Sequence, residues 1–328
     1  MSLPFSTTDI FELKKHKFNE ICLEMFHWQA KNNDIYHEFL TLLKIDSSSI
    51  FDLNHIPFMP IEFFKNHRVK TGNWRHSTIF ESSSTTDSTP STHFVGDIEW
   101  YETSFMNHFE MNYGSPHKWS ILALLPNYLE RENSSLVYMI DHLLKQSQYS
   151  NSGFYLYNHT HLKSAIEENE RKNIPTLLWG VSFALLDFSE LISKKYKCLT
   201  IMETGGMKGR RKEITRTELH QQLTSAFGNV PIHSEYGMTE LFSQAYSKKD
   251  GKFVCPPWMK IMVRRFDNAL ENARLGSSGL INVIDLANIQ TCSFIATQDV
   301  GRLFKDGTFE VLGRFDHSEQ RGCNLMVV

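Results

Sequence analysis

The middle of the chain alternates short apolar runs with stretches of helical periodicity, and this alternation limits the possible folds more than any other feature. Residues 176–181 and 198–202 have the length and composition of buried strands. A helical pattern follows each of them, over residues 183–192 and 216–227, and Gly228 ends the second helix. We therefore expect an α/β fold with helices on the faces of a parallel sheet.

The first fifty residues have the periodicity of helices. Phe18, Ile21, Cys22 and Met25 recur at three- and four-residue steps, with polar residues between them. Asp9 is followed three residues later by a glutamate, which is the pattern of a helix N-cap. This part of the chain is interpreted as an N-terminal helical region.

After about residue 250 the pattern becomes β-rich, and short segments separated by Gly, Asn and Asp predict an antiparallel or barrel-like subdomain. The predicted strands are residues 260–266, 279–285, 292–296, 301–304 and 308–312. We expect three regions in all: an N-terminal helical region (1–50), an α/β core (51–250), and a β-rich subdomain with a C-terminal tail (251–328).

The charge balance excludes one large class of function. The chain has 34 Lys and Arg against 37 Asp and Glu, a formal net charge of −3. Proteins that grip nucleic acid need a strongly basic surface, so we expect no nucleic-acid partner. We expect no membrane span, because no apolar run is long enough, and no export signal, because residues 1–8 have no basic region followed by an apolar one. Five cysteines without CxxC spacing fit a reducing, cytoplasmic location.

Residues 82–92 form a low-complexity stretch in which nine of eleven residues carry a hydroxyl. Hydroxyls and loop N–H groups can surround the anionic oxygens of nucleotide phosphates. The alternative is a flexible polar linker, and the usual P-loop pattern is absent. The candidate phosphate-binding residues are Ser82, Ser83, Ser84, Thr85, Thr86 and Ser88.

A second motif, Glu203-Thr204-Gly205-Gly206, follows the strand at 198–202. Ligands of parallel α/β sheets bind beyond the carboxyl ends of strands, and paired glycines let a flat ring approach the backbone. A tight turn without a ligand is the alternative. The basic residues 208–211 just beyond it form either a solvated turn or a phosphate clamp.

The third motif is Tyr236-Gly237-Met238-Thr239-Glu240, again just after a predicted strand. An aromatic face can stack on a base, a hydroxyl can meet a phosphate, and a carboxylate can hold Mg²⁺. The order of these residue types makes this motif more specific than the first two.

Asp299 and Arg314 are the fourth pair of candidates. A carboxylate can accept hydrogen bonds from both hydroxyls of a ribose, and a guanidinium can pair with a phosphate or the same sugar. Taken singly, Asp299 can also be a helix N-cap and Arg314 part of a surface ion pair.

Cys323 lies close to the C-terminus in the sequence Arg321-Gly322-Cys323. A neighbouring guanidinium lowers the pKa of a thiol and so favours the reactive thiolate. The alternative is a buried cysteine that only fills space.

Taken together, these motifs resemble the adenylate-forming enzymes, a superfamily that includes acyl-CoA synthetases and peptide-synthetase adenylation domains. The Tyr-Gly-x-Thr-Glu motif and the order of all the segments carry the resemblance. Within the superfamily the chain looks most like the acyl-protein synthetases (LuxE-type) of bacterial luminescence. Three further stretches support this likeness: residues 56–65, Pro256-Pro257-Trp258, and the Cys323 segment.

The resemblance implies the large N-terminal lobe of such an enzyme, without the usual small C-terminal lobe and its lysine. It also implies a two-step ligase. In the first step, ATP and Mg²⁺ activate a carboxylic acid, expected to be a fatty acid, as an acyl-adenylate. In the second step, a thiol accepts the acyl group.

The implied site is distributed over the motifs above. The hydroxyl-rich stretch would surround the β- and γ-phosphates, while Gly205, Gly206, Tyr236 and Gly237 would lie around adenine. The remaining implied contacts are Thr239 with the α-phosphate, Glu240 with Mg²⁺, Asp299 with ribose, Arg314 with ribose or phosphate, and Cys323 with the acyl group.

Three functions remain open from the sequence. The first is acylation of Cys323 for delivery to a partner, such as a reductase, a transferase or a carrier protein. The second is transfer of the acyl group to coenzyme A or a carrier-protein thiol. The third is a catalytically impaired binding subunit, because the phosphate loop carries Ser84 and Asp87 where relatives usually have glycines.

Overall fold

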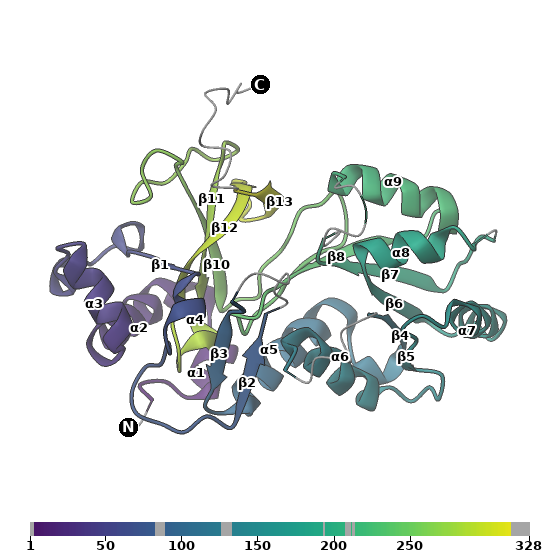
Figure 1. Cartoon of the computed structure of the whole chain (residues 1–328), viewed down its shortest axis with the longest axis horizontal. Coiled ribbons are helices and arrows are strands. Elements are labelled where there is room, and N and C mark those ends of the chain that lie inside the picture. The colour runs from purple at the N-terminus through teal and green to yellow at the C-terminus, as the bar shows by residue number, and fades with distance from the viewer. Residues whose placement is uncertain are drawn as a thin grey trace.

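The computed structural model describes residues 3–82, 89–125, 133–192, 194–206, 211 and 214–315 of the 328-residue chain. These residues form two large sheets and a two-stranded hairpin (Figure 1). No helix among the described residues is long and apolar enough to cross a membrane.

The larger sheet has six strands in the order β5-β4-β6-β7-β8-β9. Its strands are β4 (Ser120–Leu124), β5 (Gly153–Phe154), β6 (Thr176–Val181), β7 (Leu199–Thr204), β8 (Ile232–Tyr236) and β9 (Ala245–Ser247). All pairs are parallel except β8 with β9. The predicted α/β class with a parallel sheet is confirmed.

Helices cover both faces of this sheet (Figure 1). They are α5 (Ile98–Tyr113), α6 (Ser135–Gln146), α7 (His159–Arg171), α8 (Ser182–Ser189) and α9 (Arg216–Phe227). From α9, His220 lies 3.2 Å from the Ser234 hydroxyl. From α5, Phe109 stacks on Trp179 of β6 at 6.4 Å. Trp179 is aligned through Met202 with His233, the residue before Ser234. Because neighbouring residues of a strand point to opposite faces, α5 and α9 lie on opposite sides of the sheet.

The second sheet has the order β1-β12-β11-β10, and β13 also pairs with β12. Its strands are β1 (Met59–Pro60), β10 (Met259–Arg264), β11 (Ser278–Asp285), β12 (Phe294–Leu303) and β13 (Phe309–Arg314). Only the β1–β12 pair is parallel. The segment after residue 250 was expected to form an antiparallel or a barrel-like subdomain. It forms a mainly antiparallel sheet.

One strand differs from its prediction. The expected strands at 292–296 and 301–304 are parts of the single strand β12. Its two halves form one strand because both pair with β11, while β1 and β13 pair with its two ends. Register shifts at Leu280–Asn282 of β11 and at Val300–Gly301 accommodate the irregular middle.

The N-terminal helices pack on this second sheet. They are α1 (Thr7–Phe11), α2 (Phe18–Asn32), α3 (Asp34–Leu42) and the short α4 (Phe63–Asn66). Phe26 lies 5.9 Å from Phe294 of β12. The predicted N-cap at Asp9 is wrong, because Ser6 caps α1. The Asp9 carboxyl accepts a hydrogen bond from the backbone N–H of Ser6 and so completes a capping box.

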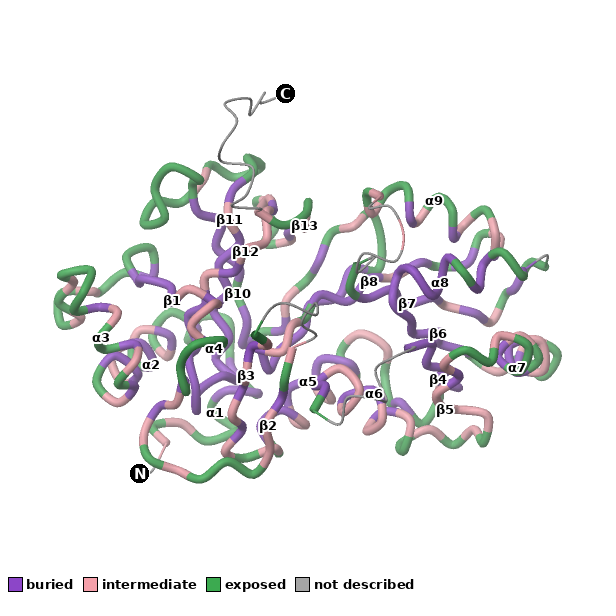
Figure 2. The backbone as a smooth tube through the Cα atoms, viewed as in Figure 1, coloured by how far each residue is buried: buried purple, intermediate pink, exposed green. Residues whose placement is uncertain are grey.

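A buried polar cluster holds the two sheets together at their centre, where the backbone is largely buried (Figure 2). Asp285, at the end of β11, accepts hydrogen bonds from the backbone N–H groups of Phe242 and Ser243, each at 2.9 Å, and from the Ser243 hydroxyl at 2.6 Å. The Trp258 indole donates to the Ser104 and Ser243 hydroxyls. These bonds hold the segment after Tyr236 against the second sheet.

Candidate functional site

The carboxyl ends of β7 and β8 bring two of the predicted motifs side by side. Thr204 and Glu235 are direct partners in the parallel register. Gly205 and Gly206 follow the first strand, and Tyr236 ends the second. Both motifs therefore lie at the sheet edge where α/β proteins bind their ligands.

Tyr236 joins this edge to the second sheet. Its hydroxyl donates to Oδ2 of Asp299 on β12 at 2.7 Å. Its ring is buried and packs edge-on against Phe253 and Phe309. Burial raises the pKa of Asp299, while the Tyr236 hydrogen bond and the charge of Arg314 partly oppose this. Two residues predicted for adenine and ribose are thus in direct contact.

Arg314 is the register partner of Asp299, across the β12–β13 pair. Its Nε lies 3.9 Å from Oδ1 of Asp299, and its Nη2 donates to Gln298 at 2.9 Å. The side chain is 71% exposed, so the guanidinium is accessible to an anion from solvent. The surface ion pair and the predicted pairing of Arg314 with ribose or phosphate are compatible here.

Glu240 is nearly buried, at 5% exposure. Burial raises the pKa of its carboxyl, while a hydrogen bond with the Ser91 side chain and the charge of Arg314 lower it. Its backbone carbonyl accepts from Asn288 at 2.8 Å. The preceding carbonyl, of Thr239, accepts from Nδ1 of His93 at 2.7 Å. The Thr-Glu turn is therefore held from two sides.

The described ends of the hydroxyl-rich stretch meet this turn. Strands β2 (Thr78–Glu81) and β3 (Thr92–Val95) form a hairpin, extended by hydrogen bonds in both directions between Ser82 and Ser91. Since Ser91 also contacts Glu240, Ser82 is brought toward the predicted phosphate region. The other candidates of this stretch, Ser83, Ser84, Thr85, Thr86 and Ser88, lie outside the described residues, as do residues 207–210 and Cys323.

The glycines of the site have different surroundings. Gly205 has a positive φ of 68°, which favours glycine, and its carbonyl accepts from the Ser182 hydroxyl at 3.0 Å. A Cβ at Gly206 would meet no atom of the described residues within 4 Å, so the described structure leaves open space beside this backbone. A Cβ at Gly237 would collide with the Glu235 carboxyl. Gly206 thus leaves room for a ligand, whereas Gly237 accommodates the chain itself.

Two buried glutamates at this edge, Glu203 and Glu235, had no predicted role. Glu203 accepts from Nε of Arg216 at 3.0 Å, and Arg216 also donates to the Val311 carbonyl of β13. Hydrogen bonds and positive charge outweigh burial and lower the pKa of Glu203. Burial raises the pKa of Glu235 to about 7. The signal available in the sequence was that each of these glutamates stands at the carboxyl end of a short apolar strand.

Glu235→Gln is expected to stabilise the protein progressively as pH rises. With its pKa at about 7 rather than 4.5, the folded protein holds a proton that the unfolded chain loses earlier. In the wild-type protein, the contribution of Glu235 to the free energy of unfolding is complete below pH 4.5 and is lost as the pH rises through about 7. The change amounts to about 3 kcal/mol. Urea unfolding at pH 5 and pH 8 measures the difference between the two proteins, and a constant difference would contradict the buried position of Glu235.

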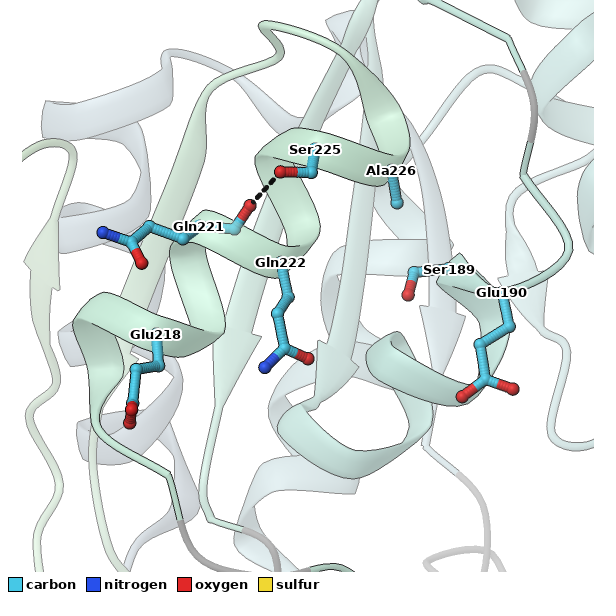
Figure 3. Close-up of a pocket in the computed structure, with 7 residues that line it drawn as sticks. All are labelled: Ser189, Glu190, Glu218, Gln221, Gln222, Ser225 and Ala226. Atoms are coloured by element: carbon cyan, nitrogen blue, oxygen red, sulfur yellow. Dashed lines mark hydrogen bonds between the residues drawn. The ribbon is translucent and has the colours of Figure 1, made fainter.

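Two concave spaces in the described structure lie away from these residues. One, of about 530 Å³, lies between α8 and α9 and is lined by polar side chains such as Glu190 and Gln222 (Figure 3). The other, of about 560 Å³, lies between α2 and β10. Neither is lined by a predicted site residue. The candidate site thus rests on the contacts among strand ends described above.

The fold matches the large N-terminal lobe of adenylate-forming ligases. One similar structure is 2-hydroxyisobutyryl-CoA ligase, in complex with 2-HIB-AMP and CoA. Its TM-score is 0.66 at 9% identity, over 92% of this chain and 70% of that one. No family model matches the chain, and no curated protein matches its sequence.

Two further structures share a smaller part of the fold. ATP-bound MatB from Rhodopseudomonas palustris has a TM-score of 0.54 at 14% identity, over 72% of this chain and 47% of that one. O-succinylbenzoate coenzyme A synthetase (MenE) from Bacillus subtilis, in complex with ATP and magnesium ion, has a TM-score of 0.51 at 16% identity, over 72% of this chain and 50% of that one. At these identities the likeness establishes the fold.

Proposed function

We propose that this protein uses ATP and Mg²⁺ to activate a carboxylic acid as an acyl-adenylate. The observation that carries the proposal is the Tyr236–Asp299 hydrogen bond, which joins two predicted nucleotide-binding residues 63 positions apart. The described ends of the hydroxyl-rich stretch, together with Glu240 and Arg314, lie around the same edge. Similar structures hold ATP or an acyl-AMP, which supports the same chemistry.

The proposed roles follow the positions of the side chains. Asp299 binds the ribose hydroxyls through Oδ1, since Oδ2 already accepts from Tyr236. The exposed guanidinium of Arg314 reaches the ribose or a phosphate. Gly205 and Gly206, which are exposed, lie against adenine with Tyr236 and Gly237. Thr239 contacts the α-phosphate, and the hydroxyl-rich stretch from Ser82 surrounds the other phosphates.

The donor set at Glu240 fits magnesium. Mg²⁺ in nucleotide sites is held by one or two carboxylates together with substrate phosphates, and no larger cluster of metal-binding side chains occurs among the described residues. Glu240 supplies a nearly buried carboxylate, with the Ser91 hydroxyl beside it. When bound, the ion neutralises charge on the phosphates and on the departing pyrophosphate.

The chemistry needs no proton transfer. A carboxylate oxygen of the acid attacks the α-phosphorus, a new C–O–P linkage forms, and the bond from the α-phosphorus to the bridging oxygen breaks to release pyrophosphate. Both reactants are anions, so catalysis consists of positioning and of positive charge near the α-phosphate. ATP–pyrophosphate exchange with a panel of acids tests this step. If the exchange rate stays at background with every acid, even when the protein's acyl-acceptor partner is added, the protein is instead a catalytically impaired binding subunit.

For the second step we propose that Cys323 accepts the acyl group as a thioester. The thiolate would attack the acyl carbon and AMP would leave. This part of the proposal rests on the LuxE-type resemblance, which also favours a fatty acid and an acyl-acceptor protein. Transfer to free coenzyme A is the alternative, because one similar ligase was solved with both 2-HIB-AMP and CoA.

Cys323→Ser is expected to abolish labelling of the protein while adenylate formation continues. The labelled acid found best in the exchange assay is incubated with ATP and Mg²⁺, and hydroxylamine-sensitive label on the protein is measured. Cys198→Ser is the matched control, because Cys198 is partly exposed and should leave labelling intact. Unchanged labelling of Cys323→Ser would remove the role of this thiol, and acyl-CoA formed by the variant would favour the alternative.

A further inference from the structure

The short helix α4 places a lysine beside the candidate nucleotide site. Phe64 of this helix is buried, and its ring lies 5.4 Å from the ring of His93. His93 in turn donates to the Thr239 carbonyl. The next residue, Lys65, is exposed. It therefore extends from a helix that is packed against the anchor of the Thr239–Glu240 turn.

Hydrogen bonds to β12 fix the other end of α4. The backbone N–H of Ile61 donates to the Ala296 carbonyl at 3.0 Å. The Glu62 carboxyl accepts from the amide of Gln298, which itself accepts from Arg314. Because Gln298 precedes Asp299 in β12, α4 is held next to the proposed ribose-binding carboxylate.

Lys65 acts electrostatically on the site from this position. The positive charges of Arg314 and Lys65 both oppose the rise that burial causes in the pKa of Glu240. Lys65 is therefore near enough to the proposed magnesium ligand for its charge to act on that carboxyl, and the packing of α4 against His93 and β12 places it there.

Of the cations around the site, Lys65 is the one left without a partner in the described part of the chain. Arg314 donates to Gln298, and Arg216 is held by Glu203 and the Val311 carbonyl. The Lys65 ammonium has no hydrogen bond or ion pair with any described residue, so it is available to an incoming anion.

We propose that Lys65 is a catalytic residue of the adenylation step, and this rests on the proposed function. Its ammonium contacts the carboxylate of the acid and an α-phosphate oxygen as the new C–O–P linkage forms and pyrophosphate departs. Its positive charge offsets the negative charge that the two anions bring together. A cation placed where charge develops lowers the barrier, because it is already oriented before the reaction.

Lys65→Met is expected to lower kcat for ATP–pyrophosphate exchange by roughly 100-fold, with a smaller change in the KM for ATP. Lys65→Arg keeps the charge and should retain much of the rate. Acyl transfer from a synthetic acyl-adenylate to the protein should be unchanged in Lys65→Met, since that reaction bypasses bond formation at phosphorus. A lysine that only stabilised α4 would not separate the two half-reactions in this way.

Lys118→Met is the control, because Lys118 is exposed and precedes β4 at the opposite edge of the larger sheet. It should match wild type in both half-reactions. Equal exchange by wild type and Lys65→Met would overturn the assignment alone, as would an equal loss in both half-reactions. No exchange by wild type with any acid would instead overturn the proposed function, and the assignment with it.

Discussion

Asp285→Ala is expected to destabilise the protein by about 3–5 kcal/mol, because it leaves several buried donors without an acceptor. The carboxylate of Asp285 is fully buried and accepts from three backbone N–H groups, those of Phe242, Ser243 and Ala287, and from the Ser243 hydroxyl. The loss should also release the segment that follows Glu240, so nucleotide binding should weaken together with stability. Urea unfolding followed by fluorescence measures the first effect, and ATP binding by calorimetry measures the second.

Asp285→Asn separates geometry from charge in the same position. Burial raises the pKa of Asp285 to about 6, so the wild-type protein pays a cost for the ionised carboxylate at neutral pH. The amide keeps one acceptor oxygen and removes this charge, so the loss should be clearly smaller than for alanine. If the Asp285→Ala variant and the wild-type protein unfold at the same urea concentration, the cluster around Asp285 does not hold the two sheets together.

Glu240→Gln is expected to reduce ATP–pyrophosphate exchange by about 100-fold or more, because the proposed Mg²⁺ loses its one protein carboxylate. Stability should change little, since the amide has the same size and can keep the Ser91 hydrogen bond. The Mg²⁺ concentration that gives half-maximal rate should rise in the variant. Exchange assays over a magnesium titration measure both effects.

Glu81→Gln is the matched control for that experiment. Glu81 ends β2 at the same hairpin, but its carboxyl is exposed and accepts from Asn133. Its replacement should leave the magnesium dependence unchanged. If the Glu240→Gln variant exchanges pyrophosphate at the wild-type rate, the metal must be bound by another residue.

Elements with strong local signals were predicted well from the sequence. The predicted helix at 216–227 matches α9, because Thr215 and Glu218 form a capping box and Gly228 ends the helix with φ of 79°. The predicted strand at 176–181 matches β6. In both cases the residues that set the boundaries are neighbours in the chain.

Features that depend on distant partners were not predicted. β12 is one strand because β11 pairs along both of its halves, and β1 and β13 pair with its two ends. Arg216 was expected as the start of a helix, yet it joins the sheets through Glu203 and Val311. Lys65 lies about 175 positions from Glu240, and no local pattern links them.

The structure brings some of the predicted site residues into contact. The motif order placed Tyr236, Asp299 and Arg314 in one region, and the structure adds the contacts that join them. The roles assigned to these residues, and to Cys323, stay predictions. The division of the chain at residues 50 and 250 also stays a prediction, and β1 crosses it by pairing with β12.

The hydrogen bond from Tyr236 to Asp299 has a consequence for how a nucleotide would enter and leave. Tyr236 belongs to the mainly parallel sheet and Asp299 to the mainly antiparallel one, so the carboxylate proposed to bind ribose is aligned by a residue of the other sheet. Any motion that separates the sheets would rotate this carboxylate and stretch the contact from Arg216 to Val311 as well. If the proposed nucleotide site is correct, affinity for the nucleotide is expected to depend on the spacing between the two sheets, so that a bound nucleotide and a closed molecule would favour each other.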